Sequence, residues 1–282
     1  MQNLSDINQI KKILSKHGFS LSKSLGQNFI IDDSVCPRMA EEAVFNDNIG
    51  VIEIGPGIGV LTVELAKRAK KVVTIELDER LLPILNETLE DYDNIVLIHG
   101  DVLKINFQKI IEENLKGMQI VVCANLPYYI TSPIIMKLLE KKLPIETIVV
   151  MVQAEAADRL CANVGTRKAG AVTVAVNFYA TVKELFFVSK EAFMPSPKVD
   201  SKVIRLLIKK DPINIVKNEK DFFSMIKMGF SKRRKTILNS LISDKISKEK
   251  LEATLDELKI SKTSRIEQLS MNELITIFNK LY

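Results

Sequence analysis

The stretch EIGPGIGVLT, residues 53–62, decides the fold. It follows the apolar run VIEI (51–54), carries glycines at 55, 57 and 59, and continues into the helical pattern VLTVELAKRA. Glycines let a backbone turn sharply and let a ligand lie against it without side-chain interference. The spacing G-x-G-x-G differs from the dinucleotide pattern G-x-G-x-x-G, so a tight strand-to-helix turn without a ligand stays possible. With a ligand, Gly55 and Gly57 are the predicted contacts.

Around this turn, apolar runs that suit buried strands alternate with helical patterns, which is typical of a parallel sheet covered by helices. The runs are VIEI (51–54), VVTIEL (72–77), IVLIH (95–99), QIVVCA (119–124) and ETIVVMV (146–152). Two later runs, VKELFFVS (182–189) and SKVIRLLIK (201–209), flank the proline-rich FMPSPKVD (193–200) and predict a strand pair around a rigid loop. The predicted fold class is α/β, a mostly parallel sheet with a late antiparallel strand.

Strand patterns end at about residue 211, and short amphipathic helices rich in Lys and Glu follow, among them FFSMIKMGFSKRRKTILNSL (222–241). We place a domain boundary near KKDPIN (209–214). The sequence therefore predicts a sheet domain over residues 1–210 and a small all-helical domain over residues 211–282.

Composition limits the class of protein. The chain has 282 residues, 46% of them hydrophobic and 27% charged, which suits a globular protein with a sizeable core. A net charge of +5 mildly favours a polyanionic partner. Cys36, Cys123 and Cys161 form no CxxC pair, so we expect a reducing compartment and no metal site. No leader-like apolar region or bilayer-length run appears. We expect a cytoplasmic protein, and a monomer because nothing suggests an obligate dimer.

Two carboxylates follow neighbouring strands of the predicted sheet. Glu76 ends the second strand, where a carboxylate can accept both hydroxyl hydrogens of a ribose, and Asp101 follows the third strand, where it could accept from an adenine amino group. Alternatively, each residue caps the next helix. Because these residues and the glycine loop share the carboxyl ends of successive strands, together they favour an adenosine-containing cofactor.

The fourth strand ends in the tetrapeptide NLPY, residues 125–128. If the Asn125 side-chain oxygen and the Leu126 carbonyl each accept one hydrogen from the exocyclic amine of an adenine, the amine nitrogen becomes more tetrahedral and its lone pair points at an electrophile. Pro127 would stiffen this backbone, and Tyr128 could stack on the base. The alternative is a strand-ending turn with Tyr128 and Tyr129 packed in the core.

The sequence resembles the KsgA-type ribosomal RNA small-subunit adenine dimethyltransferases over nearly the whole chain. The motifs that carry the resemblance are GQNFI (26–30), EIGPGIGVLT (53–62), IEL around Glu76, GDV (100–102), NLPYYITSPI (125–134), FMPSPKVDS (193–201), FSKRRKTILNSL (230–241) and SRIEQLSMNELITIF (264–278). The resemblance implies a Rossmann-like class I methyltransferase sheet. It also implies S-adenosylmethionine-dependent dimethylation of two adjacent adenosines near the 3′ end of small-subunit (16S) rRNA, within a precursor ribosomal particle, with a role in small-subunit biogenesis.

The resemblance also assigns roles to residues. It implies cofactor contacts by Gln27, Asn28, Ile30, Gly55, Gly57, Glu76, Asp101 and Asn125, of which Gln27 and Gly57 are neighbours of matched positions. Phe193 matches a residue expected to sandwich the target base opposite Tyr128, although it could be a core residue between two strands. The run Lys232, Arg233, Arg234 and Lys235 is expected on a helix, where it would contact rRNA phosphates or form a solvated face. His17 and His99 are expected to be structural or solvated.

Other functions stay open at the level of sequence. Large-subunit rRNA methyltransferases of the macrolide-resistance type share the Asn-x-Pro-Tyr chemistry, although FMPSPKVDS and FSKRRKT resemble the small-subunit group better. DNA adenine methyltransferases use related tetrapeptides, but this chain lacks a large insertion resembling their target domain. A noncatalytic ribosome-assembly factor could also keep the fold and use it only to bind rRNA.

Overall fold

The computed structural model describes residues 3–22, 26–210 and 216–282. The chain forms two compact units. The first consists of Met1–Ala157 and Lys183–Ile208, and the second consists of Asp158–Val182 and Lys209–Tyr282. The units are described separately below.

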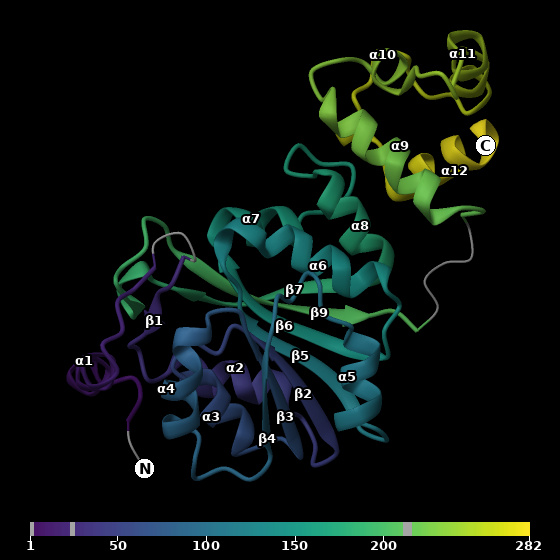
Figure 1. Cartoon of the computed structure of the whole chain (residues 1–282). Coiled ribbons are helices and arrows are strands. Elements are labelled where there is room, and N and C mark those ends of the chain that lie inside the picture. Colours follow the sequence, from purple (N-terminus) through teal and green to yellow (C-terminus); the bar gives the residue numbers. More distant parts are fainter. Residues whose placement is uncertain (1–2, 23–25, 211–215) are drawn as a thin grey trace. The chain divides into compact units, whose positions relative to one another are not determined.

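A seven-stranded sheet in the order β4-β3-β2-β5-β6-β9-β7 organises the first unit (Figure 1). Its strands are β2 (Ile49–Ile54), β3 (Lys71–Glu76), β4 (Ile95–His99), β5 (Gln119–Asn125), β6 (Ile145–Gln153), β7 (Ala180–Val188) and β9 (Ser201–Ile208). All seven predicted strands are confirmed. The pairs β2–β3, β2–β5, β3–β4 and β5–β6 are parallel, as the alternation with helices predicted.

The central strands are buried on both faces. Every residue of β2 is buried, and so are the five residues from Ile120 to Ala124 in β5. Consecutive side chains of a strand point to opposite faces, so unbroken burial requires a cover on each side. One cover is formed by α2 (Val35–Ala43) and α3 (Val60–Ala66), whose apolar side chains pack in one cluster with Val51, Val121 and Val149.

The strand β9 runs antiparallel to β6, with Ser201 paired to Gln153. This confirms the predicted late antiparallel strand. Because β9 is reversed, its first residues lie where the parallel strands end. The preceding loop contains β8 (Phe193–Met194), which pairs with β1 (Phe29–Ile30) in a separate two-stranded sheet. Segments far apart in sequence therefore meet at the carboxyl edge of the main sheet.

Five further helices lie in or start in the first unit. They are α1 (Ile7–Lys16), α4 (Leu82–Thr88), α5 (Phe107–Asn114), α6 (Thr131–Glu140) and α7 (Ala154–Leu160). A short 3₁₀ turn, Glu79–Leu81, precedes α4. Apolar residues of α1 and α4 pack together with Phe29 and Ile58 in a second cluster. None of the helices in the described part of the chain has the length and apolar character needed to cross a bilayer.

The second unit consists of helices: α8 (Ala171–Tyr179), α9 (Glu219–Ser231), α10 (Ile237–Leu241), α11 (Lys248–Glu257) and α12 (Met271–Leu281). An aromatic cluster holds it together. The ring centroid of Phe178 lies 5.7 Å from that of Phe222 and 5.3 Å from that of Phe223, and Phe222 lies 5.5 Å from Phe278. These contacts explain why α8 groups with the C-terminal helices, whereas the division at residue 210 assigned it to the sheet domain.

In the C-terminal region, one prediction is wrong and another reaches outside the described residues. The stretch 222–241 is not one helix, because α9 ends at Ser231 and α10 begins only at Ile237. The expected boundary segment, 209–214, reaches into residues 211–215, which lie outside the described residues. The bond between Lys209 Nζ and the carbonyl oxygen of Asn177, 2.6 Å, lies within the second unit.

Candidate functional site

A cavity opens at the carboxyl ends of β2, β3, β4 and β5, within the first unit. Its lining contains eleven of the twelve residues predicted to contact cofactor or base: Gln27, Asn28, Gly55, Gly57, Glu76, Asp101, Asn125, Leu126, Pro127, Tyr128 and Phe193. We call Glu76, Leu77, Asp101 and Val102 the carboxylate wall. We call Asn125, Leu126, Pro127, Tyr128 and Phe193 the tetrapeptide wall.

The glycine loop forms the floor between the two walls. Gly55 has a φ of +70°, and a Cβ atom there would meet no protein atom within 4 Å beyond its chain neighbours, so it would point into open space. Gly57 has a φ of +61°, and a Cβ atom there would lie 3.4 Å from the ring of Phe29. Both conformations favour glycine. The loop therefore leaves room at Gly55 for a ligand to approach the backbone.

On the carboxylate wall, Glu76 is only 6% exposed. Its Oε1 accepts hydrogen bonds from the backbone amides of Leu77 and Asp78, each 2.8 Å long. Burial raises the pKa of Glu76 above its ordinary value, and these bonds, with one from the Gly57 amide, oppose that shift. Glu76 does not cap the next helical turn, because Asp78 is the N-cap of Glu79–Leu81.

Asp101 lies on the next loop and is half-buried. Its Oδ1 accepts from the backbone amide of Leu103 at 2.9 Å, and its Oδ2 lies 3.6 Å from Lys104 Nζ. The next helix, α5, is capped by Asn106, so Asp101 is not its cap either. Both carboxylates therefore face the cavity with acceptor capacity left for a ligand.

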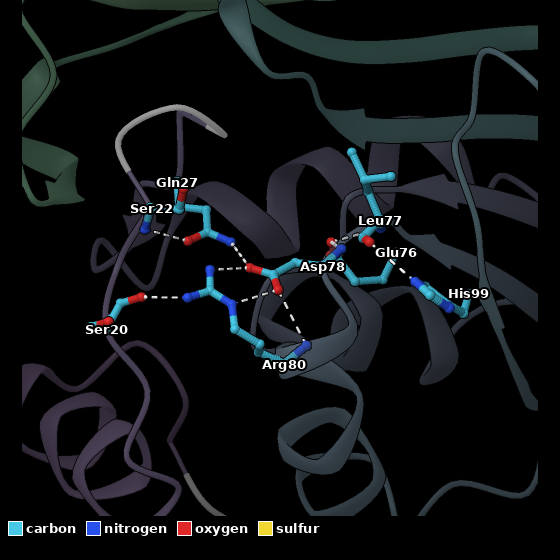
Figure 2. Close-up of polar contacts among 8 residues, drawn as sticks. All are labelled: Ser20, Ser22, Gln27, Glu76, Leu77, Asp78, Arg80 and His99. Atoms are coloured by element: carbon cyan, nitrogen blue, oxygen red, sulfur yellow. Dashed lines mark hydrogen bonds and ion pairs between the residues drawn. The ribbon is translucent and has the colours of Figure 1, made fainter.

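A hydrogen-bonded network connects the carboxylate wall to the segment before β1 (Figure 2). Asp78 accepts from Arg80 Nε at 2.8 Å and from Arg80 Nη2 at 2.6 Å, and Gln27 Nε2 donates to it at 2.8 Å. The bond from Arg80 is the main reason why the pKa of Asp78 is lowered. The Gln27 side-chain oxygen accepts from the Ser22 amide at 2.9 Å, and Arg80 donates to the Ser20 carbonyl at 3.4 Å. Asp78 thus holds two sides of the cavity together.

Sequence reasoning missed Asp78, and it also missed a clamp from α6. Lys137 Nζ donates to the carbonyl oxygens of Val102, at 3.0 Å, and Ile105, at 2.9 Å. Burial lowers the pKa of Lys137. These two bonds connect α6, the helix that follows NLPY, to the loop that contains Asp101. Leu77 and Val102 directly follow Glu76 and Asp101 in the sequence, so they could have been predicted as neighbouring cavity residues. No sequence signal points to Lys137.

On the tetrapeptide wall, Asn125 is the last residue of β5 and is partly exposed. The Leu126 amide donates to the Met151 carbonyl at 3.1 Å, which ties the tetrapeptide to the end of β6. The Pro127 carbonyl accepts from the Ile130 amide and the Thr131 hydroxyl, each at 3.2 Å. In the described part of the chain, neither the Asn125 side chain nor the Leu126 carbonyl oxygen has a hydrogen-bond partner. These are the two acceptors that the proposed chemistry needs.

The aromatic residues of this region have different environments. The Tyr128 hydroxyl lies 2.8 Å from Ser201 Oγ at the start of β9, and burial raises the pKa of Tyr128. Phe193 is 3% exposed, belongs to the core cluster of α2 and α3, and also lines the cavity. Tyr129 is 55% exposed, so the alternative in which both tyrosines lie in the core is wrong.

Five predicted residues are not among those that line the cavity. Ile30 is 4% exposed and packs in the core, while its neighbour Phe29 lines the cavity. The basic run 232–235 belongs to the second unit and forms an exposed turn rather than a helix, because α9 ends before it. Arg233 donates to the Arg167 carbonyl and lies 3.7 Å from Glu267, so it has a structural role within that unit.

Neither histidine lines the cavity, and each has a hydrogen-bond partner elsewhere. His17 is the C-cap of α1 and its Nε2 lies 2.7 Å from Glu87 Oε2. His99 Nε2 lies 3.1 Å from the Leu77 carbonyl oxygen. No group of three or more His, Cys, Asp or Glu residues suited to a metal ion occurs among residues 3–22, 26–210 and 216–282.

The lining of the cavity fits an adenosine-containing molecule. Two carboxylates supply acceptors for hydroxyl and amino hydrogens, the apolar residues Leu77 and Val102 also line the cavity, and a Cβ atom at Gly55 would point into open space. A planar base can lie against such apolar side chains while its polar edge meets an acceptor.

Comparisons with known proteins agree with this geometry. Residues 18–282 match the family model described as ribosomal RNA adenine dimethylase. A ribosomal RNA small subunit methyltransferase A from Bacillus licheniformis is 47% identical over 96% of this chain and 94% of its own length. A protein of the same name from a Geobacillus species is 48% identical over 96% of this chain and 95% of its own.

Two solved structures are also similar. A dimethyladenosine transferase from Plasmodium falciparum has a TM-score of 0.70 and 28% identity, covering 87% of this chain and 95% of that one. The 23S rRNA methyltransferase ErmE has a TM-score of 0.68 and 27% identity, covering 90% of this chain and 99% of that one.

Proposed function

Because this chain belongs to the ribosomal RNA adenine dimethylase family, we propose that it transfers methyl groups from S-adenosylmethionine to adenosines of small-subunit rRNA. The acceptors are the exocyclic amines of two adjacent adenosines near the 3′ end of that RNA. One observation carries the proposal: a single cavity brings the carboxylates Glu76 and Asp101 together with Asn125 and Tyr128 of the tetrapeptide.

The sequence relatives favour the small subunit over the large one. Proteins named as small subunit methyltransferases reach 47–48% identity over 96% of the chain. The large-subunit enzyme ErmE shares the fold at 27% identity. The shared fold supports adenine methylation in general, and the higher sequence identity supports the small-subunit substrate.

The carboxylate wall would hold the methyl donor. Glu76 would accept from the ribose hydroxyls, Asp101 would accept from the adenine amine, and Leu77 and Val102 would flank the base. When bound, S-adenosylmethionine supplies a methyl group on a sulfonium, which is an activated electrophile. Gly55 would leave the space that such a ligand needs beside the glycine loop.

The tetrapeptide wall would hold the methyl acceptor. The Asn125 side-chain oxygen and the Leu126 carbonyl oxygen would each accept one hydrogen of the exocyclic amine, which turns its lone pair away from the ring. Tyr128 and Phe193 would hold the base between them, and stacking of this kind contributes about 1–3 kcal/mol per base. Positioning of the amine supplies much of the rate acceleration, because the electrophile needs no further activation.

Binding to rRNA would also involve the second unit. Lys232, Arg234 and Lys235 form an exposed basic turn and have no ion-pair partner among the described residues. Phosphate contacts there would set affinity and its salt dependence, not the chemistry. We further propose a precursor ribosomal particle as substrate, a monomeric enzyme, and a cytoplasmic location in which the free thiols of Cys36, Cys123 and Cys161 stay reduced.

The test is methyl transfer from labelled S-adenosylmethionine to unmethylated small ribosomal subunits and, in parallel, to large subunits, followed by nucleoside analysis. We expect dimethyladenosine with small subunits only, and a loss of about 100-fold or more in Asn125→Ala, because a positioned polar partner of the reacting group is removed. Label on large subunits would contradict the assignment. Cofactor binding without transfer would instead indicate a noncatalytic assembly factor.

A further inference from the structure

An aromatic ring stands at the mouth of the cavity without an assigned role. Tyr129 lines the cavity and is 55% exposed, although its neighbour Tyr128 is partly buried and hydrogen-bonded to Ser201. In the described part of the chain, the Tyr129 hydroxyl has no hydrogen bond and its ring has no aromatic partner. Neither core packing nor hydrogen bonding explains this residue.

The ring has a defined position nonetheless. A Cβ atom built on Gly26 would lie 3.7 Å from Cδ1 and Cε1 of Tyr129, so the ring lies beside the backbone of Gly26. Tyr129 also belongs to the 3₁₀ turn Tyr128–Ile130, whose last amide donates to the Pro127 carbonyl. The turn and Gly26 together hold the ring at the rim.

The proposed reaction places a second base near this ring. The substrate has two adjacent adenosines, so when one occupies the slot between Tyr128 and Phe193, its neighbour is tethered outside the cavity by one phosphodiester link. An exposed aromatic ring next to that slot offers a π-face to the tethered base. Stacking requires the ring and not the hydroxyl, which agrees with a phenol that has no partner.

We propose that Tyr129 is a stacking platform for the nucleobase next to the target adenosine. The proposal rests on the proposed function and adds a second base subsite to the same cavity. Its ligand is a purine base of single-stranded RNA, because purines offer a larger stacking surface than pyrimidines.

The experiment compares two kinds of unmethylated small subunit: one with the natural pair of adenosines and one in which one adenosine of the pair is replaced by uridine. The kcat/KM for subunits is measured, per remaining adenosine, for the wild type, Tyr129→Ala, Tyr129→Phe and Phe187→Ala. Phe187 is a matched control, since it is also 55% exposed but does not line the cavity. Binding of S-adenosylmethionine is measured by calorimetry in parallel.

We expect Tyr129→Ala to lower kcat/KM about tenfold on natural subunits, which corresponds to the loss of one stacked base. The kcat/KM values of Tyr129→Phe and Phe187→Ala are expected to lie within about twofold of the wild-type value, because both variants keep an aromatic ring at position 129. Replacement of the neighbour by uridine is expected to slow the wild type towards the rate of Tyr129→Ala and to change that variant little.

Equal slowing of Tyr129→Ala on both kinds of subunit would overturn the proposal, because the ring and the neighbouring base would then act independently. A weaker affinity of Tyr129→Ala for S-adenosylmethionine would also overturn the proposal. It would mean that the ring supports the segment at Gly26 in cofactor binding. Absence of transfer by the wild type on natural subunits is a different result, because it would remove the proposed function itself and this inference with it.

Discussion

The two walls of the cavity differ in how many of their polar atoms are already hydrogen-bonded within the protein. On the carboxylate wall, Glu76 accepts two backbone bonds of 2.8 Å, and Asp78 behind it joins Gln27 and Arg80. On the tetrapeptide wall, the side chain of Asn125 has no partner among the described residues. A wall fixed in advance suits tight binding of a ligand. A wall with free acceptors suits contacts that form only with the reacting amine.

The largest effect on cofactor binding is expected from Glu76→Gln. The amide keeps the shape of the side chain but places a donor where a ribose hydroxyl needs an acceptor, and bonds to charged groups contribute about 1.5–3 kcal/mol. The Kd for S-adenosylmethionine is therefore expected to rise about 10- to 100-fold. Calorimetric titration measures this, with Glu79→Gln, an exposed carboxylate outside the cavity, as the matched control. An unchanged Kd in Glu76→Gln would show that the carboxylate wall does not bind the cofactor and would contradict the difference drawn between the two walls.

A smaller effect is expected from the network behind that wall. Gln27→Ala and Asp78→Asn each remove or weaken the bond between Gln27 and Asp78, so each is expected to raise the Kd for S-adenosylmethionine about tenfold or less. Because both variants act on one bond, the double variant is expected to lose less than the sum of the two single losses in binding free energy. Strict additivity would show that the two side chains act separately.

The bond between Tyr128 and Ser201 tests the tetrapeptide wall. Tyr128→Phe and Ser201→Ala remove the same hydroxyl contact and keep the ring, so each is expected to lower kcat about threefold to tenfold, the loss of one neutral hydrogen bond. The cofactor Kd is expected to stay unchanged, and the double variant is expected to resemble the single ones. A change in cofactor Kd without a change in kcat would assign the bond to the other wall.

A third carboxylate, Glu53, allows the effect of burial on stability to be measured separately from any effect on ligand binding. Glu53 in β2 is 1% exposed, does not line the cavity, and has no hydrogen-bond partner of good geometry in the described chain, although Thr62 and Thr74 lie beside it. Burial raises the pKa of Glu53 to about 7. The folded protein therefore keeps this proton while the unfolded chain releases it, so the contribution of Glu53 to stability falls as the pH rises from about 4.5 to about 7.

Glu53→Gln removes this titration. We expect the melting temperature of Glu53→Gln, measured relative to the wild type, to increase by on the order of 5 °C between pH 5 and pH 8, with the cofactor Kd unchanged. Thermal melts at several pH values measure the difference, and Glu79→Gln again serves as the control. A difference that does not vary with pH would mean that Glu53 is ionised in the folded protein.

The strands and the glycine loop could be predicted because their signals are local. Unbroken apolar runs such as 119–124 identify strands buried on both faces, and the carboxyl ends of parallel strands meet at one edge, which brought Glu76, Asp101 and Asn125 together in the prediction. The match to family motifs then supplied Phe193, whose place at the cavity depends on the reversed strand β9.

The rest depends on contacts between distant segments. Phe29 rather than Ile30 faces the cavity because β1 pairs with β8, a register that no pattern of two residues can specify. The grouping of α8 with the C-terminal helices depends on Phe178 meeting Phe222 and Phe223. The basic run 232–235 was expected on a helix, but the structure ends α9 at Ser231.

The place of β9 in the sheet also orders the events of folding during synthesis. It is the last strand along the chain, yet it lies between β6 and β7, and β7 meets the sheet only through it. The strands β2 to β6 and the loops between them, which contain Glu76, Asp101 and Asn125, are complete in sequence by Gln153. Because proteins are made from the amino terminus, a nascent chain can form the part of the cavity that contains these three residues first. The remaining part, with Phe193 in the lining and Ser201 bonded to Tyr128, forms only when the reversed strand β9 joins the sheet.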